Sequence, residues 1–272
     1  MKDIIKIILL ILCTGTLFGQ NGTRSYGAES MAIGNAAITT DNAWSIFNNP
    51  AGLYSTEQPA ILFTHQRKYG IGALSTSGAA FLYPFKTGAL GIGVSRFGDE
   101  LYNEQKLNLV FGNKVGMVAL GGSLNYYQLN IEGYGNRGIA YFDFGGIVNF
   151  SEQFVFGAFI SNINQGRISK VENGRVPTIM RSGISYRPVD VFRINIEIEK
   201  DLDFPEVFKA GIDYKFYKQF SMRMGFKSNP FIGSLGLGMN SKKIGSSYAF
   251  AHDPVLGMIH ELSVEYKLAK SR

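Results

Sequence analysis

Apolar and polar residues alternate along much of this chain. Residues 192–199 read Phe-Arg-Ile-Asn-Ile-Glu-Ile-Glu, and residues 208–216 and 262–268 follow the same pattern. Because successive side chains of a β-strand point to opposite faces, this period of two places the isoleucines on one face and the charges on the other. The pattern therefore predicts strands with one apolar and one polar face.

Runs of this kind, bounded by turn residues, predict fourteen strands. They lie near residues 59–67, 73–84, 88–97, 105–113, 117–130, 139–150, 153–163, 178–187, 190–200, 206–217, 219–228, 231–240, 244–253 and 257–268. No second apolar stretch of about 18 residues follows the N-terminus, so the sequence does not predict a helical membrane protein.

The connections between these strands form two classes that alternate along the chain. Tight connections are expected at 85–87, 113–116, 151–153, 187–190, 217–219 and 240–243, and longer ones at 98–104, 132–138, 164–177, 201–205 and 252–256. Outer-membrane barrels have short periplasmic turns, longer outward loops and an even number of strands. We therefore expect an all-β fold, an antiparallel up-and-down transmembrane β-barrel of about 14 strands, with both mature termini periplasmic. A soluble sandwich is the alternative, since period two alone does not separate the two.

The N-terminus indicates the compartment. Lys2 and Lys6 flank an apolar stretch that runs from Ile4 to Phe18 and ends at Gly19, as in a secretory signal peptide of residues 1–19. This stretch is too short for a membrane-spanning helix. The single cysteine, Cys13, lies within it, so the mature chain is expected to have neither disulfides nor a thiolate metal site.

The polar faces of neighbouring strands carry charges of opposite sign. Folding two adjacent hairpins about their turns places Glu197 opposite Lys209, and Asp213 opposite both Arg193 and Arg223. Cross-strand pairs of opposite charge stabilise a sheet. We expect these five residues to form a charge network in the lumen, with Asp213 between two guanidinium groups. The opposite faces should contact lipid, with Ile194, Ile196, Ile198, Ile212 and Tyr214.

Residues 21–58 precede the first strand and do not alternate. Residues 34–53 read Gly-Asn-Ala-Ala-Ile-Thr-Thr-Asp-Asn-Ala-Trp-Ser-Ile-Phe-Asn-Asn-Pro-Ala-Gly-Leu. This segment resembles the N-terminal signature of the FadL-like outer-membrane superfamily, and more closely that of its PorV/PorQ branch. The resemblance rests on a hatch motif of five residues, Asn49, Pro50, Ala51, Gly52 and Leu53.

The resemblance implies a division of the chain into signal peptide 1–19, N-terminal hatch segment 20–58 and barrel 59–272. The hatch would lie inside the barrel and enter it from the periplasm. In the family, the aromatic residue at the position of Trp44 packs inside the hatch. We therefore expect Trp44 to be a core residue of this segment.

Motifs of catalysis and cofactor binding are missing from the sequence. His65, His252 and His260 do not pair at metal-ligand spacing, and neither a nucleophile elbow, a phosphate-binding loop nor a dinucleotide fingerprint occurs. The net charge of +6 is spread without a basic run, which argues against nucleic-acid binding. We expect a non-enzymatic protein without cofactor or metal.

Two functions follow from the resemblance. PorV and PorQ belong to the type IX secretion system, which implies an accessory barrel of protein export that docks a partner or cargo. The alternative is a FadL-like conduit for small hydrophobic molecules, and a structural barrel is a third possibility. The expected partners are outer-membrane lipid, a protein of the secretion machinery, and a hydrophobic small molecule or detergent in the lumen. The short outward loops favour the export hypothesis.

Overall fold

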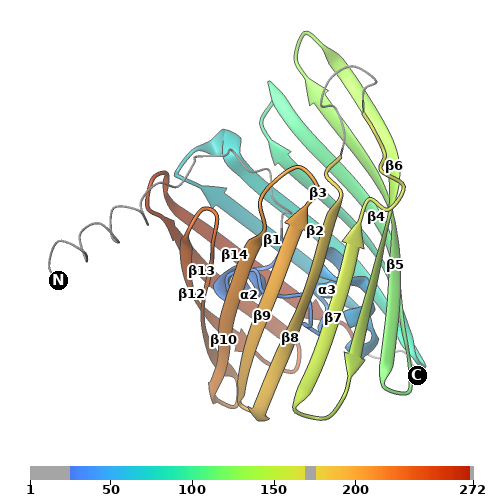
Figure 1. The fold of residues 1–272 in the computed structure, drawn as a ribbon, viewed down its shortest axis with the longest axis vertical. Helices are drawn as coiled ribbons and strands as arrows, with labels where there is room; N and C mark the ends of the chain where they lie inside the picture. The colour runs from blue at the N-terminus through green and yellow to red at the C-terminus, as the bar shows by residue number, and fades with distance from the viewer. Residues whose placement is uncertain (1–24, 169–175, 270–272) are drawn as a thin grey trace, which may run out of the picture.

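The computed structural model describes residues 25–168 and 176–269. Within them, fourteen antiparallel strands form one closed barrel (Figure 1). The strands are β1 Ala60–Lys68, β2 Ser75–Phe85, β3 Gly88–Gly98, β4 Tyr102–Val115, β5 Val118–Ile131, β6 Gly135–Asn149, β7 Phe154–Ser161, β8 Ile179–Val189, β9 Phe192–Asp201, β10 Val207–Tyr217, β11 Phe220–Lys227, β12 Ile232–Asn240, β13 Ile244–Asp253 and β14 Gly257–Lys267.

Each strand pairs with its neighbours in sequence, and β1 pairs with β14 to close the ring. The predicted fold class is therefore confirmed, because each of the fourteen predicted strands overlaps one observed strand. Closure gives every strand two neighbours, although β6 extends beyond the end of β7, so that residues 135–143 of β6 pair in the ladder with β5 alone. Within the described residues, no helix is both long and apolar enough to cross a bilayer.

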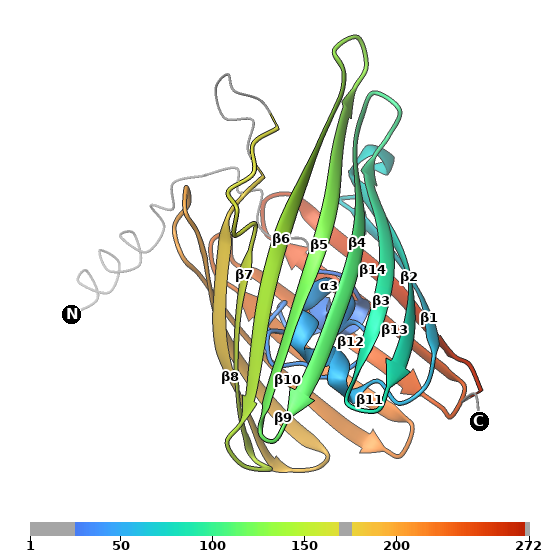
Figure 2. The same ribbon diagram turned by 90° about the vertical axis from the view of Figure 1, so that its right-hand side faces the viewer.

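The tight connections lie at one end of the barrel, beside the end of β14 (Figures 1 and 2). Two of the longer connections predicted for the other end, 98–104 and 132–138, are wrong, because the strands continue into them. Only residues 99–101 separate β3 from β4, and only 132–134 separate β5 from β6. The ladder extends to the pairs Tyr102 with Ile131 and Ile131 with Gly135, although the sequence there does not alternate. The β7–β8 connection remains long.

The two faces of the wall differ as predicted. Ile196 and Ile198 are 37% and 51% exposed on the outer face, whereas Asn195 and Glu197 point inward and are buried. Tyr214 is exposed on the outer face as well. An apolar outer face and a polar inner face are the arrangement of a membrane barrel.

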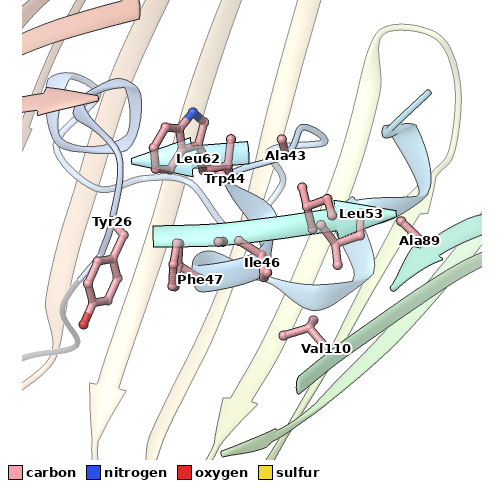
Figure 3. Close-up of a cluster of buried hydrophobic side chains, with 11 residues drawn as sticks. Tyr26, Ala43, Trp44, Ile46, Phe47, Leu53, Leu62, Ala89 and Val110 are labelled. Atoms are coloured by element: carbon pink, nitrogen blue, oxygen red, sulfur yellow. The ribbon is translucent and has the colours of Figure 1, made fainter. Parts of the chain in front are cut away.

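Residues 25–58, hereafter the plug, lie inside the barrel (Figures 1 and 2). The plug contains three short helical segments, α2 Ala28–Ala32, α3 Ser45–Asn48 and the 3-10 helix η1 Pro50–Ser55. Its hydrophobic core includes Trp44, which is 3% exposed, and the inward-facing Leu62 and Leu82 of the wall (Figure 3). The expectation that Trp44 is a core residue is confirmed.

The predicted signal peptide, residues 1–19, lies outside the described residues, as do residues 20–24 of the predicted hatch segment. Both remain predictions from the sequence.

A substitution at Ile196 tests whether this side chain faces lipid on the outside of the wall. Replacement of Ile196 by Arg should lower the free energy of unfolding by about 2–4 kcal/mol, because a guanidinium group on the lipid face has to be desolvated. The measurement is urea-dependent unfolding in lipid vesicles, with Ile196→Leu as the control for shape. An Ile196→Arg variant as stable as the Leu variant would contradict an outward Ile196.

Candidate functional site: the plugged lumen

Two buried wall carboxylates accept hydrogen bonds from the backbone of the plug. Glu261 Oε1 on β14 lies 2.8 Å from the Gly27 nitrogen, and Glu197 Oε2 on β9 lies 2.9 Å from the Ile38 nitrogen. Buried backbone N–H groups without a partner destabilise a fold. The wall therefore supplies acceptors that the short helices of the plug do not provide for themselves.

Wall arginines make the complementary contacts. Arg181 on β8 donates to the Asn48 carbonyl of the plug. Arg223 on β11 lies 3.4 Å from the Glu29 carboxylate. Together with the two carboxylates, these contacts come from β8, β9, β11 and β14, so they hold the plug at four points along the wall.

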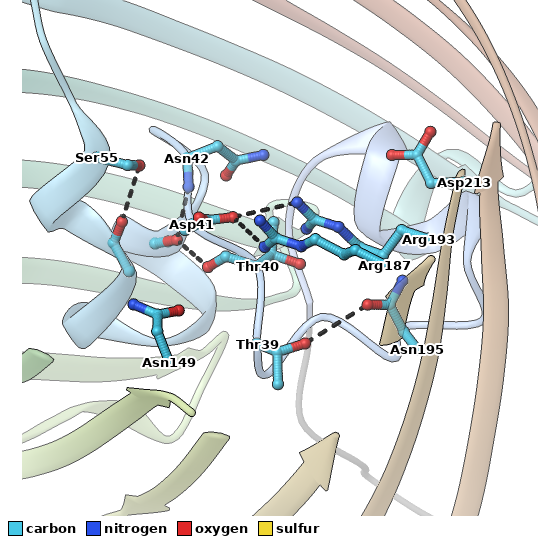
Figure 4. A network of polar contacts seen from close by, with 12 residues as sticks. Thr39, Thr40, Asp41, Asn42, Ser55, Asn149, Arg187, Arg193, Asn195 and Asp213 are labelled. Atoms are coloured by element: carbon cyan, nitrogen blue, oxygen red, sulfur yellow. Dashed lines mark hydrogen bonds and ion pairs between the residues drawn. The ribbon is translucent and has the colours of Figure 1, made fainter. Parts of the chain in front are cut away.

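Asp41 of the plug is bound by two further arginines (Figure 4). Its Oδ1 lies 2.8 Å from Arg187 Nη2 on β8 and 3.3 Å from Arg193 Nη2 on β9. Its Oδ2 accepts a hydrogen bond of 3.2 Å from the Tyr54 hydroxyl. Burial, followed by the neighbouring Asp41 charge, raises the pKa of the Tyr54 hydroxyl, which keeps that hydroxyl protonated as a donor.

Glycines of the wall allow the plug backbone to approach closely. A Cβ atom at Gly225 would lie 2.2 Å from the Ile33 carbonyl carbon, and one at Gly121 would lie 2.4 Å from that of Pro50. No real Cβ atom tolerates such a distance, so a side chain at either position would displace the plug. Close backbone approach is a recurrent reason for glycine within a strand.

The hatch motif packs against β4 and β5, where the Pro50 backbone lies against Gly112 and Gly121. Asn49 is extended, with φ −148° and ψ 106°, as the following Pro50 requires. The Asn49 amide donates to the Ile38 carbonyl at 2.7 Å, and its oxygen accepts from the Ala51 nitrogen at 3.2 Å. A Cβ at Gly52 would lie 2.3 Å from the Thr40 oxygen. Leu53 is fully buried, so every residue of the motif contributes to packing.

The strand register brings the predicted lumen charges together. Glu197 lies opposite Lys209, and Asp213 lies opposite both Arg193 and Arg223. Lys209 Nζ is 2.9 Å from Glu197 and 2.8 Å from Glu199, in a fully enclosed cluster. Glu199 was not among the predicted residues, although it continues the same polar face of β9.

The expected position of Asp213 between two guanidinium groups is only half realised. Arg223 Nε lies 3.0 Å from Asp213 Oδ2. Arg193 faces Asp213 across the ladder but donates to Asp41 instead. The prediction from the sequence paired residues of neighbouring strands only, whereas the plug brings in the Asp41 carboxylate, which competes for Arg193.

A second polar centre, around Asp143 on β6, escaped the sequence analysis. Asp143 Oδ1 accepts from the Ser161 hydroxyl at 2.7 Å and from the Asn162 nitrogen at 2.9 Å. Its Oδ2 accepts from the amide of Asn125 at 2.8 Å and from the hydroxyl of Ser123 at 3.0 Å. The inward position of Asp143 between Phe142 and Phe144 was the available signal. Its partners lie on β5, at the end of β7 and directly after β7, so only the register reveals the cluster.

A cavity of about 560 Å³ lies in the lumen next to the plug. Apolar side chains from many strands line it, among them Leu129, Ile179, Val207, Ile232 and Ile259. Tyr26 and Met31 of the plug also line it, so the plug forms part of its wall. Lys106 and Lys227 contribute basic groups, and Lys227 makes no ion pair or hydrogen bond with the described residues.

The histidines do not gather in the lumen. His65 and His260 lie on the outer face, where they contact Ser77 at 2.9 Å and Tyr248 at 2.7 Å. Throughout the described ranges, no three residues of the types His, Cys, Asp and Glu are close enough to hold a metal ion. The polar chemistry of the lumen is therefore that of carboxylates, amides, arginines and lysines.

The lysine cluster can be tested by removing its charge. Lys209→Met should lower the free energy of unfolding by about 3–5 kcal/mol, because Glu197 and Glu199 would remain buried without their common ammonium group. Lys215→Met, which changes an exposed lysine on the same strand, is the matched control. Unfolding in urea, followed by the fluorescence of the buried tryptophan, measures both. A Lys209→Met variant as stable as the control would show that the cluster does not stabilise the plugged barrel.

Comparisons with known proteins agree on the architecture. No protein-family model and no curated protein matches the sequence. Three solved structures are similar to this chain, each at 12% identity and each matched over 100% of its own length. The CymD monoaromatic hydrocarbon channel has a TM-score of 0.68 and covers 94% of this chain. The Pseudomonas putida toluene transporter TodX has a TM-score of 0.67 and covers 92%, and a Pseudomonas aeruginosa FadL homologue has a TM-score of 0.62 and covers 94%. The chain therefore has the fold of the FadL-like outer-membrane barrels.

Proposed function

We propose that this protein is a non-enzymatic outer-membrane barrel that serves as a conduit for small hydrophobic molecules. The observation that carries the proposal is the lumenal cavity beside the plug, which apolar and polar side chains line in similar measure. A volume of about 560 Å³ lies within the range of small-molecule pockets. The loop end would face outward and the tight-turn end the periplasm, as in other barrels of this class.

The polar groups of the cavity narrow the ligand class. Lys227 lies opposite Lys209 in the ladder, and Lys106 lies 4.0 Å from the Asp143 carboxylate. Lys209 is already paired with two glutamates, whereas Lys227 has its donors available. The site therefore suits a molecule with an apolar body and one hydrogen-bond acceptor.

The names of the structural neighbours support a hydrophobic small molecule as the class of ligand. CymD is described as a monoaromatic hydrocarbon channel and TodX as a toluene transporter. At 12% identity the likeness concerns the fold, so the ligand class of this chain rests on its own cavity.

A role in protein export is the second candidate function. It rests on the resemblance of residues 34–53 to the PorV/PorQ branch, and the contacts of the hatch motif are internal to the plugged barrel. None of the three neighbours is described as a secretion protein. A partner of a secretion machinery would be detected by mass spectrometry of the affinity-purified protein.

The experiment is uptake of an apolar fluorescent probe, N-phenylnaphthylamine, by cells that carry the barrel in their outer membrane. Wild-type protein should accelerate uptake over cells without it. Leu129→Trp, which fills the cavity from the inner face of β5, should abolish most of this acceleration.

The control is Leu124→Trp, because Leu124 lies on the outer face of the same strand. This variant should behave as wild type, provided that both variants reach the membrane in equal amounts. Uptake that does not respond to the wild-type barrel, or equal loss with both tryptophans, would contradict a conduit through this cavity.

A further inference from the structure

The outer face of β1 to β5 has a sharp polarity boundary. Five outward residues, one from each strand, follow one another across the ladder in a single row, and all are polar: His65, Ser77, Arg96, Gln105 and Gln128. Figure 2 shows these five strands side by side. A polar row on a face that is otherwise apolar calls for a physical explanation.

The next row toward the tight-turn end contains no charge. It consists of Phe63, Ala79, Val94, Leu107 and Tyr126. The row after that is wholly apolar, with Ile61, Phe81, Ile92, Leu109 and Leu124. The boundary therefore separates a strip of hydrogen-bonding groups from a surface suited to acyl chains.

These two rows also line a groove of about 640 Å³ on the outer wall, together with Leu262 and Val264 of β14. The groove arises because Ala79 is small, whereas Phe63 and Tyr126 on either side of it are large and about half exposed. The part of the groove toward the tight-turn end is apolar, and the part toward the loop end carries the polar row.

The positive charge of Arg96 indicates which kind of molecule the groove binds. The Arg96 guanidinium is exposed, and one of its five N–H donors is used by the Asp99 carbonyl at 3.1 Å. Gln128 adds a side-chain amide in the same row, whereas the Gln105 amide already donates to Asn103 at 3.1 Å and His65 Nδ1 lies 2.9 Å from the Ser77 hydroxyl. A phosphate group suits such donors, because arginine binds phosphate through paired charge-assisted hydrogen bonds.

We infer that this groove is a binding site for a single membrane lipid with a phosphate headgroup. The phosphate contacts Arg96 and the polar row, and an acyl chain lies over Ala79, Val94 and Leu107. The bilayer surrounds this wall, so such a lipid is at hand. The groove lies on the outside of the wall and the cavity inside it, although Ser95, Gln105 and Lys106 line both. Occupancy of the groove does not rest on the proposed transport.

The test compares two lipids that differ only in the phosphate. Purified full-length barrel in detergent is mixed with phosphatidic acid or with diacylglycerol of the same acyl chains, and bound lipid is counted by native mass spectrometry. Wild-type protein should retain one phosphatidic acid and no diacylglycerol. Arg96→Gln should weaken retention about tenfold, the factor expected for the loss of one charge-assisted hydrogen bond.

Two variants complete the design. Ala79→Phe fills the groove on the lipid face and should also abolish retention, whereas Arg137→Gln removes an equal charge from the exposed β5–β6 hairpin and should leave it unchanged. Equal retention of both lipids, or equal loss with Arg96→Gln and Arg137→Gln, would overturn the proposal. Displacement of the lipid by millimolar inorganic phosphate would indicate a simple anion site and would overturn it as well.

Discussion

Satisfaction of buried polar groups governs the inside of this barrel. The wall turns carboxylates, arginines and lysines inward, and an enclosed charge without a partner is strongly destabilising. The plug supplies the partners: Glu197 and Glu261 accept from its backbone, and Asp41 receives two arginines. Wall and plug therefore form one polar network, and the cavity is the part of the lumen that this network leaves open.

The wall was largely predictable because it follows local rules. Period two and the turn residues gave the fourteen strands and the facing of Ile196 and Glu197, and hairpin arithmetic placed Lys209 opposite Glu197. Loop lengths were less predictable, since ladder hydrogen bonds extend β4 to β6 through residues that do not alternate.

The lumen was predictable only in part. Arg193 lies where the register puts it, but its partner Asp41 comes from a segment 152 residues away. The Asp143 centre likewise joins residues of several strands. Such contacts depend on how the plug is placed in the barrel, which no local pattern records. The hatch motif marked the right segment, and its contacts are those of packing.

Hydrogen exchange measures most directly whether wall and plug form one polar network. The amides of Gly27 and Ile38, which donate to Glu261 and Glu197, should exchange as slowly as those in the middle of β9 and β14. Exchange of residues 26–53 at the rate of an unstructured peptide, while the strands stay protected, would contradict the account.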